Sequence, residues 1–118
     1  SQSTYYMAGR AEPVGFTVAG ETTLKVFARL DFDHRMKGSQ SYALEVRCDG
    51  EVWRTLHFSS RKHSSAQYVE RPDLLPGTRD TFTIPVPRGR HAFTIRCVRP
   101  EGGAVALLIR IPRSDLER

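Results

Sequence analysis

The chain has 118 residues, a formal net charge of +5 and a pI near 9.7. With 39% hydrophobic and 26% charged residues, its composition is that of an ordinary globular domain and not of a disordered or membrane protein. No apolar run approaches the roughly 20 residues of a membrane-spanning helix. We therefore predict one domain over residues 1–118, with no membrane span and with a preference for acidic partners.

Turn signals divide the chain into short segments rich in Val, Ile, Thr, Phe and Tyr. They fall at residues 19–21, 37–39, 49–50, 59–65, 71–77, 88–89 and 101–103. No long segment repeats apolar residues at the three- and four-residue spacing of a helix. The pattern predicts an all-β fold, an antiparallel β-sandwich of the jelly-roll or immunoglobulin-like kind with roughly eight short strands.

The first candidate site along the chain is Asp31-Phe32-Asp33-His34, where two carboxylates share one face at the end of a strand. A Ca²⁺ ion takes six or more oxygen ligands, and the rest of such a set is absent from this stretch. A solvated loop is the better interpretation. Because no Cys or His spacing is typical of zinc either, no metal site is predicted.

Asp49-Gly50 is a strong hairpin signal. A two-residue loop there pairs Glu45 with Arg54 and Val46 with Trp53. In that register the apolar side chains that follow the loop face away from Trp53; they are Val52, Leu56 and Phe58. Either a bulge shifts the register midway, or both faces of this strand are covered.

Two basic clusters stand out in the second half of the sequence. The loop Ser59–Ser65 contains Arg61, Lys62 and His63, and the segment Thr81–Cys97 contains Arg88 and Arg90 around Gly89. These five basic residues are the candidate binding residues for an anionic polymer. The alternative for both clusters is a charged, solvated turn.

The pattern of the segment Thr81–Cys97 also predicts a hairpin with Arg88-Gly89 as its loop. Val86 would face His91, and Ile84 would face Phe93, on one apolar side of the ribbon. His91 is expected to be a hydrogen-bonded histidine of that side rather than a ligand. Pro85 and Pro87 cannot donate to a ladder, so their strand is expected to be an edge or irregular. The stretch VPRGRHAFTI resembles strands of jelly-roll domains and carbohydrate-binding modules.

The last strand, Ala104–Ile111, is apolar on both faces until Arg110. Such strands are expected where another layer, a terminal segment or a partner chain packs on the sheet. The candidate interface residues are therefore the outward members of the two doubly apolar strands: Val52, Leu56, Phe58 and Leu108.

The two cysteines, Cys48 and Cys97, each continue the apolar face of a strand. Inward cysteines on separate strands favour one disulfide in a secreted sandwich. The alternative is a pair of buried thiols, which pack as small apolar groups. We predict the disulfide, and with it a secreted, periplasmic or cell-envelope location.

No catalytic motif is present: the sequence lacks GxSxG, HExxH and GxxxxGK[ST]. We therefore expect neither an enzyme nor a cofactor. The predicted function is a non-catalytic module for protein–protein interaction or self-assembly at the cell envelope or outside the cell. The alternative is a module that binds an acidic glycan or another anionic polymer through the basic loops. A nucleic-acid partner is not expected, because base-stacking aromatic residues are not interleaved with the charges.

Overall fold

A computed structural model describes residues 5–33, 35–62 and 75–111. These residues form an all-β, antiparallel β-sandwich, as predicted, with seven strands. The strands are β1 (Tyr6–Ala8), β2 (Val14–Phe32), β3 (Gln40–Cys48), β4 (Glu51–Ser60), β5 (Leu75–Pro76), β6 (Asp80–Arg99) and β7 (Val105–Arg110). Within these residues there is no helix long and apolar enough to cross a membrane.

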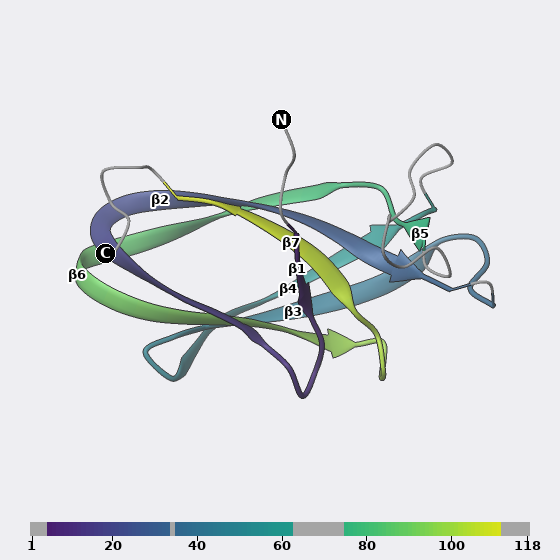
Figure 1. The fold of residues 1–118 in the computed structure, drawn as a ribbon, viewed down its shortest axis with the longest axis horizontal. Coiled ribbons are helices and arrows are strands. Elements are labelled where there is room, and N and C mark those ends of the chain that lie inside the picture. Colours follow the sequence, from purple (N-terminus) through teal and green to yellow (C-terminus); the bar gives the residue numbers. More distant parts are fainter. Residues whose placement is uncertain (1–4, 34, 63–74, 112–118) are drawn as a thin grey trace.

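The architecture is built on one long ribbon, in which β2 and β6 pair antiparallel along most of their lengths. Figure 1 shows both strands folding back at the same end of the molecule. The fold lies where Gly20 pairs with Gly89, next to a register shift between Gly20 and Thr22. A Cβ on Gly20 would collide with the backbone of Pro87, and Gly89 has a φ of 98°. Both positions therefore require glycine.

The fold in the ribbon creates the two layers of the sandwich. In one layer the first half of β2 pairs with the second half of β6, which in turn pairs with β3, and β3 pairs with β4. In the other layer the first half of β6 pairs with the second half of β2, followed by β7 and β1. We call them the β3–β4 layer and the β1–β7 layer. The short β5 pairs with the end of β2.

Alternating side chains from both layers fill a single core. Along β2 the even-numbered residues from Leu24 to Phe32 are fully buried, and the opposing layer contributes mainly β3 and the second half of β6. The largest fully buried side chains are Tyr42, Phe32, Phe93, Leu24, Leu30, Leu44, Ile84, Ile95 and Leu107. This period-two burial is the reason why the sequence pattern identified the fold class.

The predicted hairpin over Thr81–Cys97 is wrong, because the segment lies within one continuous strand, β6. Its two halves pair with β2 instead of with each other: Ile84 lies opposite Leu24, and Phe93 lies opposite Phe16. The predicted inward face is nevertheless the observed one. Among the described residues the first half of β6 pairs with β2 alone, so of the two alternatives inferred from Pro85 and Pro87, an edge or an irregular strand, the edge is observed.

The Asp49-Gly50 hairpin is confirmed, with Cys48 opposite Glu51. Asp49 and Gly50 have φ values of 51° and 86°, as the tight hairpin turn requires. A register shift then occurs between Val46 and Arg47, so Val46 lies opposite Arg54 and not Trp53 as the unbulged register predicted. This bulge explains why apolar residues of β4 occupy both alternating positions in the sequence.

That bulge removes two of the candidate interface residues from the outer surface. Leu56 and Phe58 lie opposite Leu44 and Tyr42 and pack against the chain's own core. Val52 alone remains exposed, at 52%. The doubly apolar pattern of β4 therefore does not require a partner chain.

On β7 the outward residues are also covered within the single chain. Ala106 has no exposed surface, and Leu108 is half-buried opposite Phe27 of β2. The two sequence patterns that suggested an interface between chains thus have explanations inside one molecule.

Cys48 and Cys97 are free thiols, so the predicted disulfide is wrong. Both lie on the β3–β6 pair, but Cys48 is opposite Phe93 and Cys97 is opposite Leu44. Four residues of strand separate the two positions, about 13 Å at 3.3 Å per residue. A disulfide needs Cα atoms within about 7 Å. The prediction of an oxidising compartment loses its main support with the bridge.

Candidate anion-binding face

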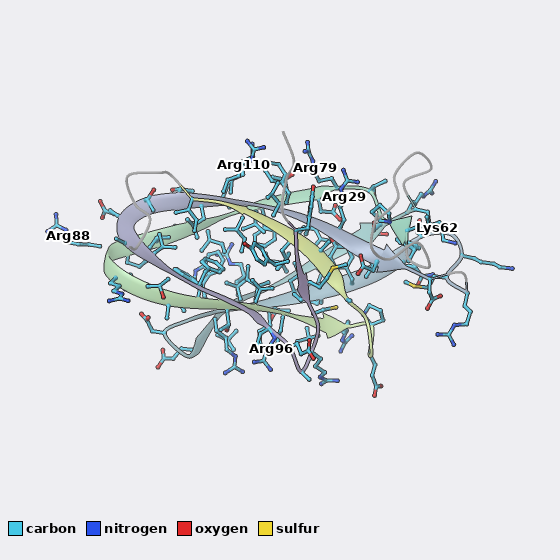
Figure 2. All side chains as sticks on the ribbon, viewed as in Figure 1. Arg29, Lys62, Arg79, Arg88, Arg96 and Arg110 are labelled. Atoms are coloured by element: carbon cyan, nitrogen blue, oxygen red, sulfur yellow. The ribbon has the colours of Figure 1, made fainter. Side chains whose placement is uncertain are left out.

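The basic clusters picked out from the sequence do not form one patch. Figure 2 shows Arg88 and Lys62 at opposite ends of the molecule, whose longest dimension is 43 Å. Arg88 and Arg90 belong to the fold in the β2–β6 ribbon. Arg61 lies at the other end, where its Nε donates to Ser39 Oγ at 3.0 Å. The fifth predicted binding residue, His63, lies outside the described residues.

A different set of cations gathers on the outer face of the β1–β7 layer. Along β2 the residues that point away from the core include Lys25, Phe27 and Arg29. Arg110 of β7 lies directly opposite Lys25. Arg79, the residue before β6, lies next to these two cations. Figure 2 shows Arg29, Arg79 and Arg110 along one edge of the molecule. We call Lys25, Phe27, Arg29, Arg79 and Arg110 the basic face.

The centre of the basic face is the ring of Phe27. The guanidinium carbons of Arg79 and Arg110 lie 4.6 and 5.2 Å from its centroid, and Lys25 Nζ lies at 5.4 Å. Although Phe27 points away from the core, only 6% of it is exposed. A cation within about 6 Å of a ring face is attracted by the ring quadrupole. The ring therefore holds three positive groups close together despite their mutual repulsion.

The cations of this face are not neutralised by carboxylates in the described part of the chain. None of Lys25, Arg29, Arg79 and Arg110 takes part in an ion pair there. Arg29 is oriented by a neutral acceptor, since its Nη1 donates to the carbonyl of Gly77 at 2.9 Å. Asp31 continues the same face along β2 but is only 6% exposed. Among the described residues this face therefore carries positive charge that no ion pair offsets.

A second cluster lies near the fold in the β2–β6 ribbon, where the β3–β4 turn meets β6. Asp49 Oδ2 lies 2.6 Å from His91 Nδ1, and Asp49 Oδ1 accepts from the backbone N–H of Ala92 at 2.9 Å. The Cys48 thiol lies beside the same carboxylate, with Sγ 3.7 Å from Oδ2. His91 is thus hydrogen-bonded, as expected, but to a turn at the surface. These three side chains have the donor types of a metal site.

The ionisation of this second cluster follows from its contacts. The hydrogen bond to His91 lowers the pKa of Asp49, and the same bond raises the pKa of His91. Burial raises the pKa of Cys48, and the neighbouring Asp49 carboxylate acts in the same direction. These contacts favour the carboxylate form of Asp49, the protonated form of His91 and the neutral thiol form of Cys48.

Sequence reasoning missed both places for the same reason. The basic face combines residues from β2, β7 and the segment before β6, and none of those segments is a basic run. The available signal was the alternation Lys25-Val26-Phe27-Ala28-Arg29, which places two cations and an aromatic ring on one side of a strand. In the second cluster, His91 lies 42 positions from Asp49, so no local spacing reveals it.

Comparison with known proteins assigns no family. No family model matches the sequence, and no curated protein matches it. Among solved structures the chain is similar to a family GH115 4-O-methyl-α-glucuronidase with specificity for decorated arabinogalactans, with 15% sequence identity and a TM-score of 0.49. The match covers 96% of this chain and 15% of that one, so the chain spans a small part of that enzyme's length.

Proposed function

We propose that this chain is a non-catalytic binding module that recognises an acidic glycan through the basic face. The observation that carries the proposal is the convergence of three cations on Phe27, with Arg29 beside them and no ion pair among them in the described residues. Such a surface attracts polyanions over a distance set by ionic strength.

The chemistry of the face favours carboxylate groups on an extended polymer. A guanidinium offers a planar fork of N–H donors that matches a carboxylate, and three of the four cations are arginines. Lys25 and Arg29 lie four residues apart on β2, so the charges extend over about 13 Å. That spacing suits several acidic groups in series better than a single small anion.

The aromatic residue of the face argues against nucleic acid as the ligand. Proteins that bind single strands offer open aromatic rings on which bases stack. Here the exposed side of Phe27 is covered by Lys25, Arg79 and Arg110, and the ring is 6% exposed. The ring positions the cations and leaves no platform for a base.

The test is a binding titration with polygalacturonate, a carboxylated glycan, at several salt concentrations. The variant R79E/R110E should lose binding. The control K62E/R88E makes the same change in net charge but places it at the two ends of the molecule, so it should bind nearly as well as the wild-type protein. Equal losses in both variants would refute a localised site. Tighter binding to a single-stranded oligonucleotide than to polygalacturonate would refute the glycan.

A second candidate function, self-assembly, is favoured by one observation on β4. Within the described residues this ten-residue strand pairs only with β3, so one side is an open edge that also carries the exposed Val52. A second copy of the chain would add to this edge by strand pairing. Sedimentation of the wild-type protein and V52K over a range of concentrations tests it. Self-association weakened in V52K supports the candidate, and a wild-type monomer throughout contradicts it.

A further inference from the structure

The cluster of Cys48, Asp49 and His91 contains a contact that requires explanation. The His91 ring lies between two acceptors, since Nδ1 is 2.6 Å from Asp49 Oδ2 and Nε2 is 2.9 Å from the carbonyl oxygen of Arg88. A neutral imidazole has only one N–H and can satisfy only one of them. A ring that carries both protons satisfies both contacts, and so does a metal ion at Nδ1 once Asp49 Oδ2 has moved to the spacing of two metal ligands.

We propose that Cys48, Asp49 and His91 form a Zn²⁺ site, with Cys48 Sγ, Asp49 Oδ2 and His91 Nδ1 as ligands. A thiolate, a carboxylate and an imidazole together suit zinc, whereas Ca²⁺ and Mg²⁺ take oxygen ligands. On binding, the ion replaces the proton on His91 Nδ1 and the proton of the Cys48 thiol, and both protons pass to solvent.

The distances between the ligand atoms are close to those of a zinc centre. Bonds of 2.0–2.3 Å at tetrahedral angles separate neighbouring ligand atoms by about 3.3–3.7 Å. The three ligand atoms all lie within 4.8 Å of one another, and Cys48 Sγ and Asp49 Oδ2 are already 3.7 Å apart. The distance of 2.6 Å between His91 Nδ1 and Asp49 Oδ2 must open by less than 1 Å to reach that spacing.

Hydrogen bonds to the surrounding backbone hold two of the three ligands, His91 and Asp49, in place. With Nε2–H donated to the carbonyl of Arg88, the lone pair of His91 Nδ1 points toward the cluster. The N–H of Ala92 occupies Asp49 Oδ1 and leaves Oδ2 for the ion. The backbone N–H of Asp49 also donates to the carbonyl of Ala92 at 2.7 Å, which fixes the turn to β6. The site is therefore organised before an ion arrives.

The location of the site beside a groove indicates a role for the bound ion. Cys48 lies on the wall of a groove of about 560 Å³ between the two layers, together with Trp53, Glu21 and Pro87. Three protein ligands leave a fourth position on tetrahedral zinc for water or for a donor atom of a bound molecule. This zinc site is separate from the basic face, and neither proposal depends on the other.

The test uses Co²⁺ as a spectroscopic substitute for Zn²⁺, added to the full chain. We expect one Co²⁺ per chain, with a sulfur-to-cobalt charge-transfer band that Zn²⁺ displaces. C48S should lose that band, and C97S, which removes the other cysteine, should keep it. H91Q and D49N should weaken Co²⁺ binding at least tenfold. Absence of the band from the wild-type protein, or its persistence in C48S, would overturn the proposal.

A measurement on the wild-type protein covers the case in which C48S does not fold. Zn²⁺ should slow alkylation of Cys48 by iodoacetamide, followed by peptide mass mapping, because a coordinated thiolate is shielded. It should also raise the midpoint of thermal unfolding, since the ion binds the folded chain. Alkylation of Cys48 at the same rate with and without Zn²⁺ would show that Asp49 and His91 form only a structural ion pair.

Discussion

On the outer face of β3 and β6, Glu45 Oε1 lies 2.7 Å from Arg47 Nε and 3.7 Å from Arg96 Nε. On the outer face of β2 and β7, Lys25, Arg79 and Arg110 converge on Phe27, and no described carboxylate pairs with them. Figure 2 places Arg96 on the edge of the molecule opposite Arg29, Arg79 and Arg110. Both faces carry basic residues, but among the described residues the cations of the first face share a carboxylate and those of the second do not.

The difference shows why net charge alone does not locate a binding site. Glu45 is 18% exposed, so its carboxylate is held between two cations and reduces the field that they present. Phe27 does the opposite, because an aromatic ring attracts cations without cancelling their charge. A cluster of cations around an aromatic ring therefore keeps its positive charge, whereas a cluster around a carboxylate is partly neutralised.

Neutralising two arginines on each face is the strongest way to test this difference. R79Q/R110Q should lower the affinity for polygalacturonate at least tenfold and reduce the slope of log K against log salt by about two, one counterion per lost cation. R47Q/R96Q removes the same charge from the other face and should change affinity less than threefold. Titrations at four salt concentrations measure both. Matching slopes in the two variants would mean that the faces are equivalent.

Replacing the centre of the basic face should have a smaller effect on affinity. F27L keeps an apolar side chain but removes the ring, so Arg79 and Arg110 lose their anchor and affinity should fall about fivefold. The lost ring contacts should also lower the free energy of unfolding by about 2 kcal/mol in urea.

The control for that variant is F58L, which shortens a half-buried side chain that packs with Tyr42 and Phe82. It should cost a comparable free energy of unfolding and leave affinity unchanged. A drop in affinity in F58L equal to that in F27L would attribute the effect to stability rather than to the basic face.

The smallest expected effect is an increase in affinity for polygalacturonate. E45Q releases Arg47 and Arg96 from their shared carboxylate, and affinity should rise about twofold as the second face becomes available. The ion pairs are partly exposed, so stability should fall by less than about 1 kcal/mol. Titration calorimetry and urea unfolding of the one variant measure both. An affinity below that of the wild-type protein would contradict this view of the paired face.

The alternation of apolar and polar residues specifies which face of a strand is buried, but not which strand it pairs with. The inward face of each half of β6 was predicted correctly, because period-two burial depends only on the local sequence. The partner strand was not, because Ile84 fits as well opposite Phe93 as opposite Leu24. The disulfide prediction was wrong for the same reason. Alternation placed both cysteines inward but does not specify their positions along the neighbouring strands.

The candidate site was harder to predict than the fold. Arg61, Lys62, Arg88 and Arg90 were selected because they are close together in sequence, but strand topology separates the two pairs by most of the length of the molecule. The basic face depends on β7 pairing beside β2, which brings Arg110 opposite Lys25. Composition and local spacing do not specify that pairing.

The most direct test of the central claim is amide chemical-shift mapping during titration with short oligogalacturonates. The account predicts that the shifts concentrate on Lys25–Arg29, Arg79 and Leu108–Arg110 and diminish as salt is added. Shifts concentrated on Glu45–Arg47 and Arg96, or on Arg61–Lys62 and Arg88–Arg90 at the two ends of the molecule, would contradict it.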